Sequence, residues 1–220
     1  DGSYSFDTLD DFDYLAEGDT TSVTFAYFLQ DSETDASGSP VYSEPATVTI
    51  EVVGVNDTPE FIGDDTGQVT EDSLPTRSSG KLEVVDPDNG ESSIDASRAP
   101  QPVGDVLGSL RIASDGSWSY TVDNNRLQYL AEGETRDELF TVYAFDGTAH
   151  QITITINGTN DTPVISLALN DSDSASLTES TEVPAEELTA TGTLSVSDID
   201  VIDQVAPQVI AVSESLSTGL

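Results

Sequence analysis

The chain has 220 residues, of which 36% are hydrophobic, a low share for a globular protein but enough for one or two domains with hydrophobic cores. Its 42 Asp and Glu residues outnumber 6 Lys and Arg residues, so the formal net charge is −36. A surface this acidic repels nucleic acid and anionic membranes and attracts cations. No apolar run is long enough to span a membrane. The absence of Cys excludes disulfides and thiolate chemistry.

Short runs of alternating apolar and polar residues, typical of half-buried β-strands, fill the middle of the chain. In the last of these runs, Ile152, Ile154 and Ile156 share one face. Turn signals containing Gly at residues 114–116 and 146–148 separate neighbouring runs and predict tight hairpins. The strands predicted here are 68–70, 81–85, 109–113, 117–122, 138–145 and 151–157, and residues 126–132 form the one candidate helical turn.

Several motifs occur twice in the same order, which predicts internal repeats. The tetrapeptide Asn-Asp-Thr-Pro begins at residue 56 and again at residue 160, so its copies lie 104 residues apart, about one domain length. Residues 1–6, 14–20 and 23–31 match residues 115–120, 129–135 and 138–146, whereas residues 69–72 and 80–88 match residues 177–180 and 192–200.

The order of these matches predicts three segments. Residues 1–58 are the C-terminal half of a first repeat, 59–162 are a complete repeat, and 163–220 are the N-terminal half of a third. Roughly seven short strands in about 100 residues are typical of an immunoglobulin-like sandwich. The predicted fold class is therefore all-β, with tandem antiparallel β-sandwich repeats. Aromatic residues at matching places, such as Phe25 and Phe140, are expected to pack between the sheets.

The residues offer little for catalysis and much for cation binding. The single His150 has no Ser or Cys nucleophile near it in any motif, so we expect no enzymatic activity. Calcium prefers six to eight oxygen ligands, and acids recur at turns and strand ends of the complete repeat, where solubility charges have no reason to be periodic. These residues are Glu71, Asp86, Asp88, Glu132, Asp146, Asn160 and Asp161.

The combined motifs resemble VCBS repeats of very large bacterial surface and biofilm adhesins, many of them secreted by type I systems and ending in RTX repeats. The resemblance is carried by Asp-Gly-Ser-Trp-Ser-Tyr at 115–120, Tyr-Leu-Ala-Glu-Gly at 129–133, Gly-Thr-Asn-Asp-Thr-Pro at 158–163 and Gly-x-Leu-x-Val-x-Asp-x-Asp at 80–88. It covers nearly the whole chain. It implies an extracellular location on a bacterial surface, in a longer protein of which this chain is a part.

The arrangement is also similar to cadherin repeats, in which calcium ions lie between successive domains. By this resemblance, the first junction would use Glu17, Asn56 and Asp57 with Asp86, Asp88 and Asp146, and the second Glu71, Glu132, Asn160 and Asp161 with Asp198 and Asp200. Ala16 and Ala131 stand where cadherins have Asp, and Gly54 and Gly158 replace the first acid of the hinge. Fewer ions than the three of a cadherin junction are therefore expected.

The predicted function is that of a non-enzymatic extender, stiffened by calcium, that projects a distal adhesion module in cell adhesion or biofilm formation. Its expected partners are calcium ions and neighbouring repeats, with host or surface glycans or proteins bound through other domains, and with no nucleic acid and no membrane insertion. The alternative is a calcium-dependent module that itself binds a carbohydrate or protein, for which the long loop at 32–44 with Tyr42 is the candidate surface.

Overall fold

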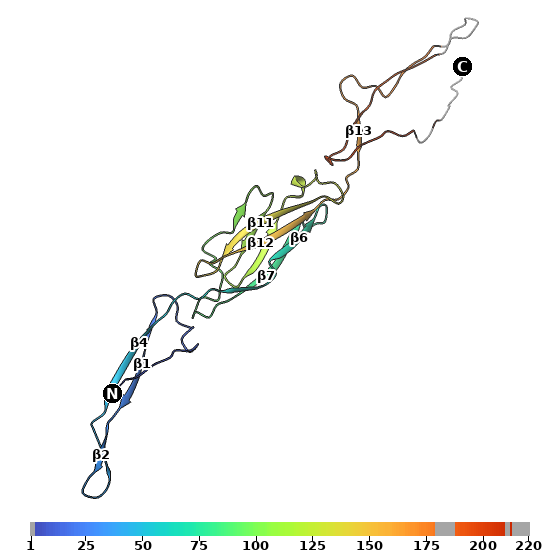
Figure 1. The fold of residues 1–220 in the computed structure, drawn as a ribbon. Helices are drawn as coiled ribbons and strands as arrows, with labels where there is room; N and C mark the ends of the chain where they lie inside the picture. The colour runs from blue at the N-terminus through green and yellow to red at the C-terminus, as the bar shows by residue number, and fades with distance from the viewer. Residues whose placement is uncertain (1–2, 179–187, 210–211, 213–220) are drawn as a thin grey trace.

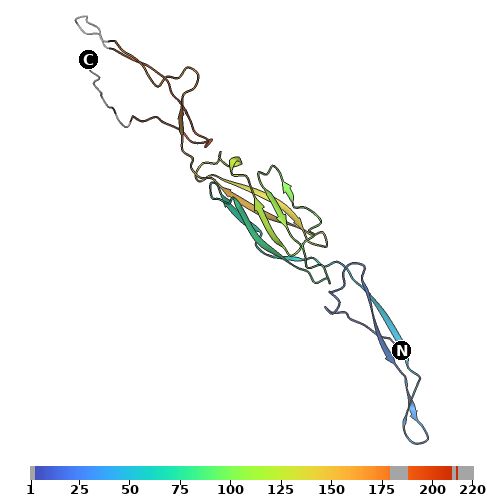
Figure 2. The ribbon, with the colours of Figure 1, turned by 180° about the vertical axis from the view of Figure 1, so that it is seen from behind.

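The computed structural model describes residues 3–178, 188–209 and 212. Three β-structured segments follow one another along one line, with the largest in the middle (Figure 1). The view from behind shows the same order, and both shorter segments are joined to the middle unit by single crossings of the chain (Figure 2). None of the described residues forms a helix long and apolar enough to cross a membrane.

The middle unit is a sandwich of two four-stranded sheets, as the alternating pattern predicts. One sheet has the order β5-β7-β10-β9 and the other the order β6-β12-β11-β8. The bounds are β5 Glu60–Gly63, β6 Thr66–Thr70, β7 Arg77–Val85, β8 Gln101–Val103, β9 Ser109–Ile112, β10 Ser117–Thr121, β11 Thr135–Tyr143 and β12 Ala149–Asn157. All six strands expected from the sequence are present, and the turns at 114–116 and 146–148 connect β9 to β10 and β11 to β12.

Two strands and one pairing were not predicted. β5 and β6 are one stretch of chain that changes sheets at Gly63, whose φ of 107° lies in the region that favours glycine. After the change β6 pairs with β12 in parallel, whereas the other pairings within the unit are antiparallel. β8 is an edge strand that contains Pro102, opposite Phe140. The short 3₁₀ turn lies at Asn124–Arg126, just before the predicted position.

The core lies between the two sheets. Its largest members include Trp118, Tyr120 and Phe140, which are 3%, 0% and 2% exposed, so these aromatics pack as expected. The indole N–H of Trp118 donates to the carbonyl of Asp64 (2.7 Å) across the change of sheets. Ile152, Ile154 and Ile156 of β12 are fully buried beneath them.

The N-terminal segment repeats part of this sandwich. β1 (Thr20–Tyr27) and β4 (Ala46–Val53) pair antiparallel, and a hairpin of β2 (Gln30–Thr34) and β3 (Pro40–Tyr42) extends beyond them (Figure 1). β1 pairs with β4 in the register of β11 with β12, because Thr20 lies opposite Val53 as Thr135 lies opposite Asn157. Its aromatic residues are exposed, unlike their counterparts in the middle unit: Tyr4 61%, Phe6 39%, Tyr14 41% and Phe25 38%.

The C-terminal segment repeats the start of the sandwich. β13 (Val164–Ser166) pairs with β14 (Ser195–Ser197), with Val164 opposite Ser197 as Glu60 lies opposite Val85 in the middle unit. The sequence match of 69–72 with 177–180 falls partly on residues 179–180, outside the described residues.

Candidate metal centres

The loop after β7 carries two buried carboxylates into the first junction. Asp86 and Asp88 are 8% and 1% exposed. Oδ1 of Asp86 accepts the main-chain N–H of Asp88 (2.9 Å), and Ser92 closes the loop by hydrogen bonds with both main-chain groups of Asp86 (3.0 Å each). The loop is therefore fixed by its own hydrogen bonds, and both acids are held at the end of the sandwich.

Contacts across the first junction bring in the hinge residues. The main-chain N–H of Asp57 donates to Oδ2 of Asp88 (2.9 Å), and the side-chain amide of Asn56 donates to Oδ2 of Asp146 (3.4 Å). The main-chain N–H of Asn89 donates to the carbonyl of Tyr14 (3.1 Å) in the N-terminal segment. Five of the six acids and amides predicted for this junction thus lie together.

The second junction is built in the same way from residues of the C-terminal segment. The main-chain N–H of Asp161 donates to Oδ2 of Asp200 (2.8 Å), which is 2% exposed. Oδ1 of Asp198 accepts the N–H of Asp200 (3.2 Å), and the N–H of Val201 donates to the carbonyl of Tyr129 (3.3 Å). The amide of Asn160 donates to the carbonyl of Asp161 (2.6 Å), as Asn56 does to Asp57 (2.7 Å).

Glu71 enters the second junction from the end of β6. It is 1% exposed, Oε2 accepts the N–H of Thr159 (3.1 Å), and Oε1 accepts the side-chain amide of Gln128 (2.9 Å). The two acids of the Leu-Ala-Glu-Gly turns behave differently, because Glu17 and Glu132 are exposed and form no hydrogen bond or ion pair with the rest of the described chain. The charge of Glu132 still contributes, after burial, to the raised pKa of Asp203 in the C-terminal segment.

Buried side-chain oxygens at both junctions, four of carboxylates and one of a hydroxyl, have no hydrogen-bond partner among the described residues. They are Oδ2 of Asp86 and Oδ1 of Asp88 at the first junction, and Oδ2 of Asp161, Oδ1 of Asp200 and the hydroxyl of Thr159 at the second. A buried acceptor without a donor costs about 1–3 kcal/mol, and more when it is charged. These oxygens are the ligand type that calcium prefers, so the donor set fits that ion.

The electrostatics of the junctions agree with this donor set. Burial raises the pKa of Asp86, and the charges of Asp88, Asp146 and Asp57 raise it further. Burial likewise raises the pKa of Glu71. Burial alone would raise the pKa of Asp146, but hydrogen bonds from Thr148 and Asn56 together lower it. Within the described part of the chain, no three His, Cys, Asp or Glu side chains already form a group arranged to hold a metal. Unscreened repulsion between the carboxylates favours such separation.

The structure adds acids that the sequence reasoning missed. Glu91 and Asp203 lie three residues after Asp88 and Asp200, and burial followed by neighbouring carboxylates raises the pKa of both. The signal was present, since the Asp-x-Asp repeats both continue to an acid at this spacing. Asp72 was also missed, because its match in the third segment is Ser180.

The Gly residues in the hinges have a steric reason. A Cβ on Gly158 would lie 2.4 Å from the carbonyl oxygens of both Leu130 and Ala131, and a Cβ on Gly54 would lie 2.3 Å from those of Leu15 and Ala16. Such distances are far below contact, so the hinge can pass the Leu-Ala-Glu-Gly turn only as Gly. The acid that the cadherin pattern would place here is excluded by backbone packing.

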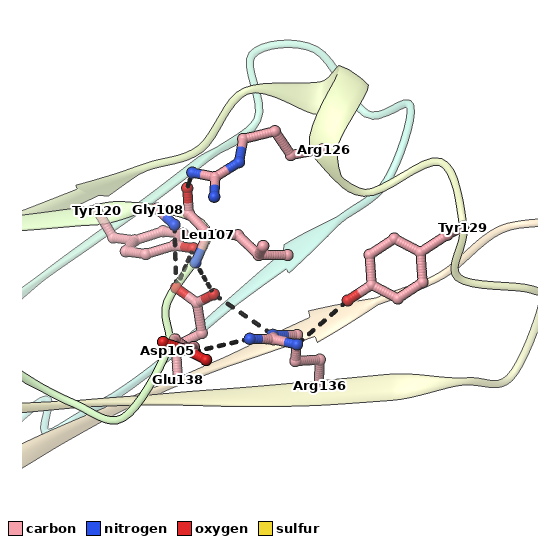
Figure 3. Close-up of polar contacts among 8 residues, drawn as sticks. All are labelled: Asp105, Leu107, Gly108, Tyr120, Arg126, Tyr129, Arg136 and Glu138. Carbon is pink, nitrogen blue, oxygen red and sulfur yellow. Dashed lines mark hydrogen bonds and ion pairs between the residues drawn. The ribbon is translucent and has the colours of Figure 1, made fainter.

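A second buried carboxylate, Glu138 on β11, lies inside the sandwich and serves its fold (Figure 3). It accepts hydrogen bonds from the hydroxyl of Tyr120 (2.8 Å) and the N–H groups of Leu107 and Gly108, and it pairs with Arg136 (3.6 Å). Arg136 also donates to the carbonyl of Asp105 (2.7 Å). The cluster fixes the loop before β9, and its carboxylate oxygens are saturated with donors.

Comparison with known proteins finds one family model and several solved structures that are similar to this chain. Residues 56–158 match the family model of the bacterial cadherin-like domain. No curated protein matches the chain. The chain is similar to solved structures of PcdhgB3 EC1-4 (14% identity, TM-score 0.39, 84% of this chain and 56% of that one) and of the protocadherin gamma B2 extracellular cadherin domains 3-6 (17%, 0.40, 81% and 39%). It is also similar to mouse clustered PcdhgC3 EC1-3 (17%, 0.36, 83% and 56%).

The chain therefore spans between 39% and 56% of the length of these three structures. The family match covers the middle unit, which consists of two four-stranded sheets and contains the parallel pairing of β6 with β12. Residues 56–158 are therefore similar to the bacterial cadherin-like domain.

Proposed function

We propose that the chain is a section of a tandem array, with residues 1–58 as the C-terminal half of one repeat, 59–162 as a complete repeat and 163–220 as the N-terminal half of the next. The proposal is supported by the equal register of β1–β4 with β11–β12 and of β13–β14 with β5–β7. The hinge Gly residues support it as well, because a Cβ on either one would lie within 2.4 Å of the carbonyl oxygens of the same two residues of the preceding turn.

The array acts as a non-enzymatic structural extender whose junctions bind calcium. Asn56, Asp57, Asp86, Asp88 and Asp146 hold the ion at the first junction. Glu71, Asn160, Asp161, Asp198 and Asp200 hold it at the second, and Glu17 and Glu132 join by rotating from their exposed positions. A bound calcium ion supplies positive charge that neutralises carboxylates contributed by both neighbouring domains. The residues of the chain then hold the two domains in one orientation.

One observation carries this proposal: the same hydrogen bond forms at both junctions. In each, the main-chain N–H of the hinge Asp donates to one carboxylate oxygen of a buried Asp, whose other oxygen has no partner. Asp57 donates to Asp88 (2.9 Å) and Asp161 to Asp200 (2.8 Å), while Oδ1 of each acceptor is buried without a partner. The main-chain bond uses one carboxylate oxygen and leaves the other directed to a cation. A scattered acidic surface has no reason to repeat this geometry.

The wider setting follows from the resemblance to VCBS repeats. The array belongs to a secreted bacterial surface adhesin of the RTX type, exported by type I secretion, and it projects a distal module in cell adhesion or biofilm formation. The acidic surface suits this role, because its net charge keeps an exposed extender soluble and separate from other chains.

Small-angle X-ray scattering of the full chain, with calcium and with chelator, tests the extender. We expect a larger maximum dimension and a narrower range of conformations in calcium. A variant with both Asp88→Asn and Asp200→Asn should lose the response, whereas a variant with both Asp105→Asn and Asp137→Asn, which changes the charge equally away from the junctions, should keep it. Equal dimensions of the wild type in both conditions would refute the calcium-dependent extender.

A second candidate function is supported by the β2–β3 hairpin. Phe28 and Tyr42 pack edge to face there with ring centroids 4.8 Å apart, and they are 59% and 52% exposed. Exposed aromatic pairs are common in contacts with carbohydrates and proteins. A glycan array tests this candidate: a specific hit that Tyr42→Ala abolishes supports a binding module, and the absence of any hit argues against it.

A further inference from the structure

Asp72, which directly follows β6 and Glu71, is held in an unusual conformation. Its φ is 58°, in the left-handed region that residues other than Gly seldom adopt. Asn124 holds it from two sides, because its amide donates to Oδ1 of Asp72 (2.6 Å) and its carbonyl accepts the main-chain N–H of Asp72 (2.9 Å). Left-handed residues of this kind persist where surrounding contacts stabilise them and are frequent at functional sites.

Gln128 places the carboxylate of Asp72 beside that of Glu71. One side-chain nitrogen, Nε2 of Gln128, donates to Oε1 of Glu71 (2.9 Å) and to Oδ1 of Asp72 (3.0 Å). The two oxygens share this nitrogen, so they can be at most about 6 Å apart, the two bond lengths together. Glu71 is almost fully buried and pairs with no Lys or Arg among the described residues. Two carboxylates at this distance repel unless a cation lies nearby.

The remaining oxygen of Glu71 directs this pair to the second junction. Oε2 of Glu71 accepts the N–H of Thr159, whose own hydroxyl is buried without a partner, as are Oδ2 of Asp161 and Oδ1 of Asp200. Asp72 is therefore linked to the hinge through hydrogen bonds, from Asp72 to Gln128, from Gln128 to Glu71 and from Glu71 to Thr159.

We propose that Asp72 is a further ligand of the cation at the second junction, contributed by the upstream domain beside Glu71. The proposal rests on the proposed function, since it adds a ligand to the calcium site between the two domains. Position 131 of the adjoining turn is Ala, and Glu132 reaches the site only by rotating from its exposed position. Asp72 supplies a further acid, which Asn124 and Gln128 already hold beside Glu71.

Isothermal titration of the full chain with calcium chloride tests this assignment. Asp72→Asn keeps an oxygen that accepts from Asn124 and Gln128 but removes the charge. We expect a loss of at least tenfold in affinity at about half of the sites, because the first junction does not contain residue 72. Asp137→Asn is the matched control: it removes one charge from an exposed residue of β11 that only accepts from Thr155 (2.7 Å), and it should bind as the wild type does.

The two levels of the proposal fail in different ways. If the wild type binds calcium and Asp72→Asn gives the isotherm of Asp137→Asn, the role of Asp72 is wrong and the junction site stands. If the wild type binds no calcium, both are wrong. Trp118 fluorescence checks that each variant is folded, and Asp72→Glu serves if Asp72→Asn unfolds. Asp72→Glu keeps the charge but displaces it, so it should bind at half of the sites with reduced affinity, and wild-type affinity there would refute the assignment.

Discussion

Replacing Asp88 by Asn should raise the stability of the middle unit in chelator and reduce the stabilisation that calcium adds. Asp88 is 1% exposed, Oδ2 accepts the N–H of Asp57, and Oδ1 has no partner. Asn keeps the acceptor for Asp57 and removes the charge. Two unit charges about 5 Å apart repel by about 3 kcal/mol at an effective dielectric constant of about 20. In chelator, the relief of repulsion should therefore raise the free energy of unfolding by about 1–3 kcal/mol.

In calcium the same substitution removes a charged ligand. For a dissociation constant of about 0.1 mM, typical of extracellular sites, about 10 mM calcium stabilises the folded state by about 2.7 kcal/mol. A tenfold weaker site reduces that stabilisation to about 1.4 kcal/mol, so the variant gains about half as much from calcium as the wild type does.

Urea unfolding followed by fluorescence measures both effects, because the single tryptophan, Trp118, is buried in the core of this unit. Asp105→Asn, at an exposed position, controls for the change of net charge. If Asp88→Asn lowers stability equally in calcium and in chelator, the residue acts only through its hydrogen bond and the cation site is wrong.

Three further substitutions follow from the packing. Gly158→Ala places a Cβ 2.4 Å from two carbonyls and should cost about 1–3 kcal/mol in urea unfolding, whereas Gly133→Ala, with no atom within 4 Å of its Cβ, should cost only the strain of its φ of 85°. Glu138→Gln replaces a saturated carboxylate and removes the ion-pair partner of Arg136, so the melting temperature should fall by more than with Asp137→Asn. Burial and the neighbouring Glu138 raise the pKa of Tyr120 far above 10, so the stability that its protonated form contributes is present below pH 10 and is lost as pH rises beyond it. Tyr120→Phe should be less stable at neutral pH and should flatten this alkaline decline in a pH series of melting temperatures.

The strands were predictable where one face is apolar, and the two missed strands show where that signal ends. β12 alternates Ile with Thr, because one face packs in the core and the other faces outward. β5 has four residues and β8 has three, including Pro102, and neither alternates regularly between apolar and polar residues. The parallel pairing of β6 was also beyond sequence reasoning, since it follows from the change of sheets at Gly63 and not from the residues of β6.

For the candidate site, the sequence repeats predicted the hinge acids. Which of the other matching acids lie at the junctions depends on packing, which the repeats do not show. Asn56, Asp57, Asp86 and Asp88 meet because their main-chain bonds close the junction. Glu17 and Glu132 match each other just as well in the sequence, but both are exposed, in turns whose carbonyls pack against the hinge Gly residues. The residue that matches Asp72 in the third segment is not an acid, so the repeats do not predict Asp72 as a site residue. Its hydrogen bonds to Asn124 and Gln128 are what identify it.

At both junctions, main-chain groups set the orientation of the neighbouring segments, and the buried carboxylates control the stiffness. Asn89 and Val201 donate the same main-chain N–H to the carbonyls of Tyr14 and Tyr129, although their side chains share no chemistry, so the docking orientation is set by backbone. The buried Asp residues add charge, which opposes docking until a cation neutralises it. Chelation should therefore widen the distribution of angles around one preferred orientation and leave the fold of each domain intact. Because each junction varies independently, the gain in length from calcium should increase with the number of repeats.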